Sequence, residues 1–350
     1  MSRSFLPAAL LASAVCSSTP ALAQYNNDCR SHNPTFDPPL YSDAECTNSA
    51  TLICGGDGDG ADNHDPIQKI PVGSGFLYVG FSTRVDTNGV RDDNVTTWVL
   101  ELACGQSADV LIFGTGYGCH NAPEYTAGDD AARIDTIIRD VIGLTGTVKL
   151  AIVAPHSHAD HMSPEVYHLL TGSFGYTFDK IYAHADEFAN VKNIAGVAGC
   201  TGSSFTAAEK SGPTNIFKSI GRANDNCNAV QPGNDCETAW NFHSTVKHFN
   251  TTLGRTWFRG RDGHTRGGVD MVIDYLGVEA TRYVIYGSAT PCEVVDNNCF
   301  NDNSYVPALR MTPDCVAPRV LTGVVWRVAA HGDIALIMLP HPNPCPVPPP

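Results

Sequence analysis

The sequence is poor in basic residues. Its 350 residues include 22 Lys and Arg against 36 Asp and Glu, a formal net charge of −14 at pH 7 with neutral histidines. This balance argues against partners that are nucleic acids or anionic membrane surfaces. The sequence also lacks a G-x-S-x-G motif and any repeat at a fixed short period. The sequence therefore indicates neither a serine hydrolase nor a solenoid fold.

Long hydrophobic runs are absent after the N-terminus, so no membrane-spanning helix is expected. The N-terminal segment itself has Arg3, an apolar stretch from Phe5 to Val15, and the small residues Ala21-Leu22-Ala23. This order is typical of a signal peptide with its cleavage site. We predict that residues 1–23 are removed, that the mature chain starts near Gln24, and that the protein is secreted or periplasmic.

Cysteine is plentiful. Removing Cys16 with the signal peptide leaves 12 of the 13 cysteines, and an even number in an exported chain favours disulfides. Cys227 with Cys236 and Cys292 with Cys299 are close enough in sequence to staple loops, but the pairing stays open. Lipid anchoring at Cys16 is an alternative, although the residues before it match a lipobox poorly.

The domain organisation follows from composition. Residues 24–70 are rich in Cys, Pro, Asp and Gly without a periodic pattern, which predicts a disulfide-tied extension. Residues 71–345 carry the β signals of one large domain. Within it, residues 196–250 break the rhythm and predict an insertion that forms a wall or lid over a site. Residues 346–350 are a proline tail.

The hydrophobic pattern predicts alternating strands and helices. Strands are expected at 76–81, 95–102, 110–113, 148–154, 180–184, 255–258, 269–275, 283–286 and 334–339. A helix is expected at 129–144, because its apolar residues recur at three-and-four spacing, and a short helix at 164–170. This order indicates an α/β domain.

One motif concentrates the chemistry of the chain: Pro155-His156-Ser157-His158-Ala159-Asp160-His161, just after the apolar run 148–154. On the chain's own residue frequencies, H-x-H-x-D-H is expected by chance about once in a thousand such sequences. Imidazole and carboxylate suit Zn²⁺ best. Because alternate residues of an extended segment point to one side, His156 and His158 can bind one ion while Asp160 and His161 face a second.

Such a two-metal site needs further ligands. His264 is the best fifth ligand, since it lies in a glycine-flanked turn between strands. His341 is the best sixth, because it follows the strand 334–339, whereas His331 precedes that strand and is expected at the opposite edge of the sheet. His184 and His120 also follow strands and are candidates for second-shell or substrate-facing groups; the alternative for both is a surface loop.

These motifs together resemble the metallo-β-lactamase superfamily. The resemblance covers roughly residues 71–345 and uses five segments: Phe76-Leu77-Tyr78-Val79-Gly80, Val110 to Gly116, His156 to His161, Gly263-His264-Thr265 and Leu339-Pro340-His341-Pro342. It implies an αββα four-layer sandwich, the metallo-β-lactamase fold, with the metals at the sheet edge and hydrolysis as the usual chemistry.

Ser288 makes the resemblance specific to one subclass of the superfamily. Many hydrolases of the superfamily have a bridging aspartate at this point, whereas the His-rich third subclass of metallo-β-lactamases has a serine. That subclass implies His156, His158 and His264 for one ion, and Asp160, His161 and His341 for the other. The chain departs from the family at Gly114, where aspartate is usual.

The sequence therefore predicts a dinuclear zinc hydrolase acting on a small-molecule substrate. Two ions sharing a water lower its pKa toward 7, and the resulting hydroxide attacks a carbonyl, with Asp160 orienting it. Opening of a β-lactam ring is the first specific expectation. The alternatives are a lactone or other ester hydrolase, and a metal-holding binding protein without activity. The oligomeric state is not predicted.

Overall fold

A computed structural model describes the part of the chain that builds two β-sheets and the helices beside them. The described residues are 52–54, 66–72, 75–85, 91–116, 129–163, 165–171, 174–194, 205–212, 214–220, 248–261, 267–275, 281–285, 287, 325–328 and 338–341. The predicted signal peptide, the proline tail, His120, His264, Ser288 and His331 lie outside these residues.

The first sheet has eight strands, which follow one another in chain order. They are β1 (Leu52–Cys54), β2 (Pro66–Val72), β3 (Gly75–Val85), β4 (Arg91–Glu101), β5 (Val110–Phe113), β6 (Lys149–Val153), β7 (Thr177–His184) and β8 (Phe217–Ile220). The pairs from β1 to β5 are antiparallel, and those from β5 to β8 are parallel. The parallel strands therefore end at a common edge.

The second sheet has six strands in the order β14-β13-β12-β11-β10-β9. They are β9 (His248–Asn250), β10 (Gly254–Arg261), β11 (Gly268–Tyr275), β12 (Thr281–Ile285), β13 (Val325–Val328) and β14 (Met338–His341). All neighbours are antiparallel except β12 and β13. Strands β10 and β11 pair along their whole length, from Gly254 with Tyr275 to Arg261 with Gly268.

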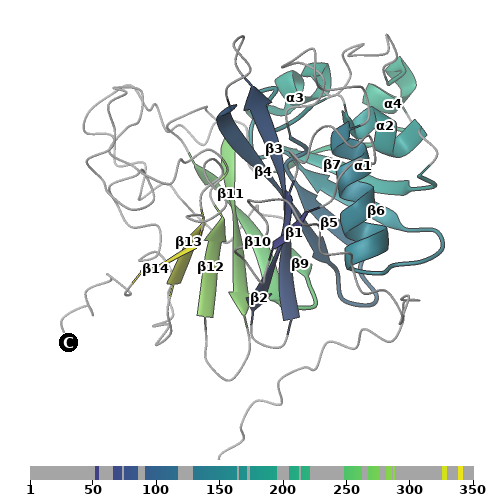
Figure 1. The fold of residues 1–350 in the computed structure, drawn as a ribbon. Helices are drawn as coiled ribbons and strands as arrows, with labels where there is room; N and C mark the ends of the chain where they lie inside the picture. The colour runs from purple at the N-terminus through teal and green to yellow at the C-terminus, as the bar shows by residue number, and fades with distance from the viewer. Residues whose placement is uncertain are drawn as a thin grey trace, which may run out of the picture.

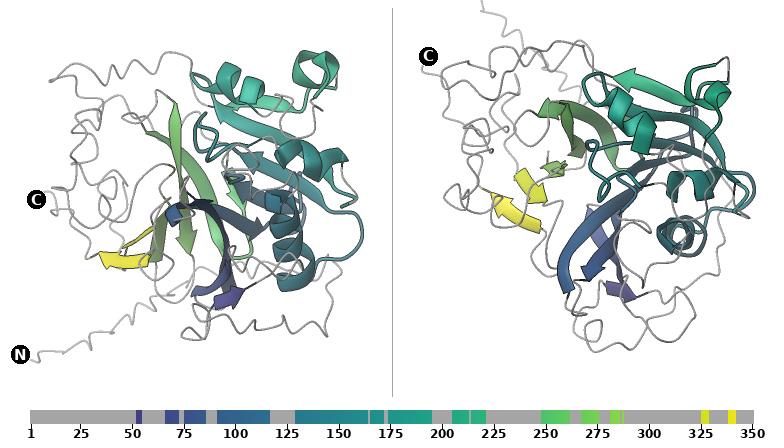
Figure 2. Two further views of the ribbon diagram at one scale, coloured as in Figure 1. Left: turned by 45° about the horizontal axis from the view of Figure 1, so that its top comes forward. Right: turned by 90° about the horizontal axis from the view of Figure 1, so that it is seen from above.

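Helices cover one face of the first sheet, and the second sheet packs against its opposite face (Figures 1 and 2). The helices are α1 (Asp129–Asp135), which continues as the π-helical turn η2 (Thr136–Val141), then α2 (Glu165–Thr171), α3 (Phe188–Ile194) and α4 (Ala207–Ser211). Among the described residues, no helix lies on the outer face of the second sheet. The described residues therefore form three layers, one of helices and two of strands, of the expected αββα sandwich.

Side-chain alternation in the central strands explains this layering. In β5, Val110 and Ile112 join the cluster under the helices, while Leu111 and Phe113 join the cluster between the sheets. In β6, Leu150 and Ile152 face the helices in the same way. Successive residues of a strand point to opposite faces, so a strand buried on both faces is apolar throughout. The continuous apolar runs in the sequence reflect this double burial.

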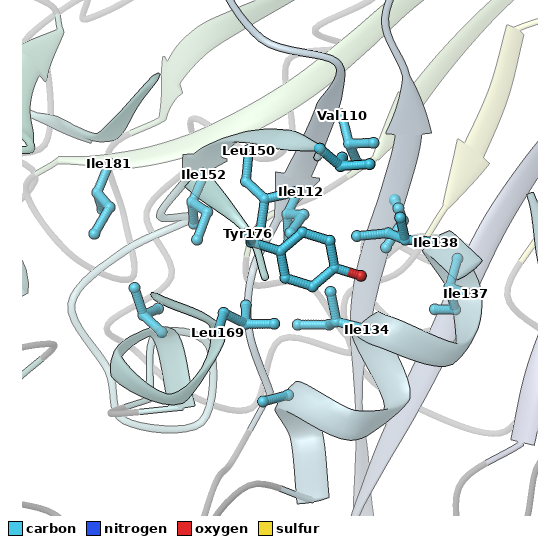
Figure 3. Packing of buried hydrophobic residues seen from close by; sticks show 14 of the residues in the cluster. Val110, Ile112, Ile134, Ile137, Ile138, Leu150, Ile152, Leu169, Tyr176 and Ile181 are labelled. Atoms are coloured by element: carbon cyan, nitrogen blue, oxygen red, sulfur yellow. The ribbon is translucent and has the colours of Figure 1, made fainter. Parts of the chain in front are cut away.

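Figure 3 shows the cluster between helix α1 and the first sheet. Ile134, Ile137 and Ile138 pack from the helical side against β5 and β6. Tyr176 is also buried there, and its hydroxyl donates a 2.5 Å hydrogen bond to Asp135. Burial raises the pKa of the Tyr176 hydroxyl, which stays protonated as a donor. The only polar atom that Tyr176 brings into this cluster is therefore satisfied.

The α/β fold expected from the sequence is confirmed, and the predicted helix at 129–144 is α1 with η2. Two expectations about boundaries are wrong. The extension 24–70 contributes β1 and β2, where Ile67 is buried. The insertion 196–250 contributes α4, β8 and β9, so its two ends form an edge strand of each sheet. In both segments the added strands are stabilised by pairing with other strands: β1 with β2, β2 with β3, β8 with β7, and β9 with β10.

Two further observations concern the predicted export. Cys104 is disulfide-bonded, as the even cysteine count favours. None of the helices in the described ranges has the length and apolar character needed to cross a bilayer.

The buried face of β6 yields a stability prediction. Ile152 is fully buried under the helices, so Ile152→Ala should lower the free energy of unfolding by about 2–5 kcal/mol, whereas Ile152→Val should cost about 0.5–1.5 kcal/mol. Urea denaturation of both variants measures the difference. Equal losses for the two variants would contradict the packing described here.

Candidate metal centre

The histidine loop begins where three parallel strands of the first sheet end. Phe113 pairs with Val153, and Val153 pairs with Tyr182. The backbone continues this alignment past the strands: Gly114 N–H donates to Val153 O at 3.1 Å, and Ala154 N–H to Tyr182 O at 2.9 Å. The ends of β5, β6 and β7 therefore form one edge, as expected for the carboxyl ends of parallel strands.

A tight turn then brings the side chains of the loop together. The N–H groups of His161 and Met162 both donate to His158 O, at 3.1 and 3.0 Å. This turn reverses the chain and places Asp160 and His161 beside His156. One ligand atom from each of these three residues lies within 4.8 Å of the others. The ring centroids of His156 and His161 are 4.4 Å apart.

This group of three is suited to a cation. His156 and His161 are each 1% exposed, and the Asp160 side chain is 24% exposed. Asp160 Oδ2 lies 3.5 Å from His161 Nε2. Two buried imidazoles and a carboxylate are a ligand set that Zn²⁺ accepts. The donor chemistry of the loop therefore fits the expected metal.

The grouping differs from the expectation that His156 and His158 form one pair. His158 is exposed, and its ring packs edge-on against His156 at a centroid distance of 4.7 Å. The reason is the turn at 158–162, because a turn does not keep the two-residue alternation of an extended strand. Asp160 and His161 lie in one group with His156, and the division of the ligands between two ions stays a prediction.

Thr115, just after β5, fixes this turn through its backbone N–H and its hydroxyl. Thr115 N–H donates to His161 O at 2.9 Å, and Thr115 Oγ1 accepts from Ser163 N–H at 2.9 Å. Thr115 and Ser163 are both fully buried. Gly114, before them, has φ +76°, and a Cβ there would lie 3.3 Å from Thr96 O. An aspartate at position 114 would be strained in this backbone conformation.

The second sheet meets the loop at Pro155. Val269 N–H, near the start of β11, donates to Pro155 O at 2.7 Å. Gly287, after β12, is so close that a Cβ would lie 2.1 Å from Val269 O and 3.1 Å from Pro155 Cβ. Its N–H donates to the buried Asp270 carboxylate at 3.1 Å. Strand ends of the second sheet therefore reach the same edge as the histidine loop.

Two predicted site residues outside the described ranges, His264 and Ser288, lie close in sequence to this junction. Arg261 and Gly268, which pair with each other, bracket the segment that contains His264, and Ser288 follows Gly287 directly in the sequence. His184 is described: it is 5% exposed at the end of β7. Its Nδ1 would lie 2.7 Å from a Cβ on Gly267, the last residue of that segment. His184 thus lies beside Gly267, and its predicted role next to the metal ligands or the substrate stays a prediction.

The predicted direction of the last strand is wrong. His341 was expected to follow a strand ending at the loop's edge, but it is the last residue of β14, which is antiparallel to β13. Val328 pairs with Ile285 near Gly287, whereas His341 pairs with Val325. Three residues at about 3.3 Å each separate these levels by about 10 Å. In the sequence, His331 follows the end of β13 by three residues.

Sequence reasoning missed three polar residues of this edge: Thr115, Glu187 and Asp270. Each is buried, at 0%, 4% and 1% exposure. Asp270 in the run Gly-Val-Asp-Met-Val-Ile and Glu187 after Ala-His-Ala-Asp are charges next to apolar strands, which is the one signal available in the sequence. Their partners lie 17 and 80 residues away, a relation that no local pattern encodes.

Comparison with known proteins was made by sequence and by structure. No family model and no curated protein matches the sequence. Among solved structures, the chain is similar to metallo-β-lactamase IND-7, with TM-score 0.40, 14% identity, and coverage of 76% of this chain and 91% of that one. It is also similar to the Rm3 metallo-β-lactamase, with TM-score 0.34, 14% identity, and 72% and 75% coverage. The metallo-β-lactamase SMB-1, solved with mercaptoacetic acid, gives TM-score 0.35, 15% identity, and 67% and 73% coverage.

The chain has an α/β fold built of two stacked sheets and helices. Two facing sheets, helices on the outside of the first, and a histidine loop at the strand ends are the features expected from the motifs. At these TM-scores the likeness carries no argument about metal or substrate. The function proposed below rests on the side chains of this chain.

The hydroxyl that holds the metal loop can be tested at Thr115. Thr115→Val keeps the shape but leaves the buried Ser163 N–H without its acceptor, which should cost about 1–3 kcal/mol of stability. The loop should loosen, and zinc affinity, measured by competition with a chelator, should fall. Thr115→Ser keeps the acceptor and serves as the matched control. Similar affinities for the Val and Ser variants would contradict this role.

The last ligand can be tested at two histidines. The motif Leu-Pro-His-Pro favours His341, whereas the register of β13 and β14 favours His331. We expect one of the substitutions His341→Ala and His331→Ala, and not the other, to lower the zinc content measured by native mass spectrometry from two ions to one. Loss with His341→Ala supports the motif, and loss with His331→Ala supports the register. An unchanged content in both variants would remove both histidines from the site.

Proposed function

We propose that this protein is an exported, metal-dependent hydrolase that binds zinc at the histidine loop. The observation that carries the proposal is the convergence of His156, Asp160 and His161 within 4.8 Å at the edge where the two sheets meet. Six ligands, with His158, His264 and either His341 or His331 added to this group, are consistent with two zinc ions. Export rests on the N-terminal pattern and the cysteine count.

The chemistry that bound zinc supplies is polarisation of a carbonyl and acidification of a water. The chain's own contribution begins with Asp160. Its carboxylate is partly exposed beside His161, so it can accept a hydrogen bond from the attacking water, orient it, and receive its proton. In hydrolysis of a cyclic amide or ester, a C–O bond forms and the C–N or C–O bond of the ring breaks. The proton passes to the departing atom.

The buried surroundings of the loop strengthen these interactions. His156, His161, Thr115 and Ser163 are all at most 1% exposed, so the local dielectric is low on the protein side and charges there interact more strongly than in water. The backbone hydrogen bonds from Thr115 and Val269 hold the loop before substrate binds. A preorganised site of this kind loses little free energy to reorganisation during the reaction.

The substrate class we propose first is the β-lactam. Ser288, in place of a bridging aspartate, supports it, because that replacement resembles the His-rich third subclass. Lactone or other ester hydrolysis uses the same attack on a carbonyl carbon.

The proposal is tested with the mature protein loaded with zinc. We expect about two zinc ions per chain by mass spectrometry and turnover of nitrocefin, with activity lost on chelation and restored by zinc. Turnover of an aliphatic lactone without nitrocefin hydrolysis would keep the metal hydrolase and change its substrate class.

Two substitutions accompany this test. His156→Ala should reduce both zinc content and turnover to background, since it removes the central imidazole of the group. His168→Ala, on α2 and outside the group, is the matched control and should change neither. Zinc binding without turnover across the whole substrate panel would leave a metal-holding protein rather than an enzyme.

A further inference from the structure

A second buried carboxylate lies at the same edge, between β7 and α3. Glu187 is 4% exposed, and His184, three residues before it, is 5% exposed. Glu187 N–H donates to His184 O at 3.0 Å, and Glu187 O accepts from Val191 N–H at 2.9 Å. Its backbone is therefore fixed on one side by the turn after β7 and on the other by the start of α3. The hydrolysis mechanism proposed above does not use the Glu187 side chain.

That side chain reaches across to the second sheet. Glu187 Oε1 accepts a 3.2 Å hydrogen bond from Gly267 N–H, 80 residues later in the chain. The approach is close: a Cβ on Gly267 would lie 2.7 Å from Glu187 Cγ and 2.7 Å from His184 Nδ1. Only glycine leaves room for both side chains. The contact is thus a direct link from β7 to the end of the segment 262–267.

The position of Gly267 in the chain explains why its hydrogen bond to Glu187 matters for the metal centre. It lies three residues after His264 in the sequence and two before Val269, whose N–H bonds to Pro155 O at the base of the histidine loop. The end of this segment is therefore held at two points, by Pro155 and by Glu187. A histidine can complete a metal site only if the backbone that carries it is fixed relative to the other ligands.

The chemistry of Glu187 also favours a role beyond packing. Its Oε2 is buried and has no hydrogen-bond partner among the described residues. A buried acceptor left unsatisfied is costly, and a charged one more so. An apolar side chain of similar size would fill the same space without this cost, but it could not hold the Gly267 N–H.

We propose that Glu187 is a positioning residue of the metal centre, which fixes Gly267, three residues after His264 in the sequence, beside the end of β7. The inference rests on the proposed function in one respect, the assignment of His264 as a zinc ligand. The anchoring itself is a property of the metal-free chain, so the two can be tested separately.

The first measurement is zinc affinity, obtained by competition with a chelator for the full mature chain and its variants. Glu187→Ala should weaken one of the two zinc sites about 10- to 100-fold, the loss typical for removing a group that orients a ligand. Glu187→Gln retains an acceptor oxygen for Gly267 N–H and should stay close to the unmodified protein. A zinc affinity of Glu187→Ala equal to that of the unmodified protein would overturn the proposal. So would an equal loss with Gln, because charge rather than the hydrogen bond would then matter.

The second measurement is hydrogen exchange of the metal-free protein over residues 262–270. Loss of the anchoring bond in Glu187→Ala should speed exchange at the Gly267 amide about three- to tenfold, and Glu187→Gln should not. Unchanged exchange in both variants would overturn the anchoring. If the unmodified protein bound no zinc but Glu187→Ala still sped exchange, the proposed function would fail while the anchoring stood.

Discussion

The hydrogen bond from Val269 N–H to Pro155 O is the contact on which the geometry of the site depends. It is 2.7 Å long and joins the first residues of β11 to the base of the histidine loop after β6. Most of the remaining contact between the sheets is apolar packing, which is non-directional, and the backbone hydrogen bonds that join the ends of β4 and β9 lie elsewhere in the chain. Gly287 reinforces the same point, since its lack of a side chain lets β12 approach both Val269 and Pro155. One directional bond and one glycine thus fix the second sheet against the loop.

The loop itself poses a second constraint, because it places polar side chains where the surroundings exclude water. Imidazoles at 1% exposure need a rigid backbone around them if they are to face a common point. Thr115 provides this by bonding to the carbonyl of His161 and the N–H of Ser163. The backbone N–H of Thr115 makes the first bond and its neutral hydroxyl accepts the second. Neither adds a buried charge beside Asp160, so that carboxylate is the only acid of the group.

Local patterns in the sequence were enough for the elements that are buried on both faces. The continuous apolar runs of β5 and β6 and the helical spacing in α1 have few alternatives, and the histidine motif after β6 marks the site directly. Strands β1 and β8 were missed because they have only three and four residues. Their stability comes from pairing, which depends on neighbours rather than on their own composition.

Direction and long-range contact were the properties that the sequence did not contain. An apolar run such as the one before Pro340 has the same hydrophobicity read either way, so its pattern could not show that β14 runs opposite to β13. The contact between Glu187 and Gly267 depends on folding of both sheets, and a glycine in a turn suggests only backbone freedom until the opposing side chains are known.

The division of the site between two sheets has a thermodynamic consequence. His156, Asp160 and His161 belong to one short loop and can form part of their group before the sheets associate, whereas ligands after β10 can join only when the second sheet is docked. A metal that binds the complete site binds the folded state more tightly than any partly folded one, and therefore stabilises the docking itself. The packing of Phe113 against Phe258 between the sheets, at a centroid distance of 5.7 Å, is then linked to metal affinity although neither residue belongs to the group of candidate ligands. Weakening that packing should lower metal affinity for the same reason that adding metal strengthens it.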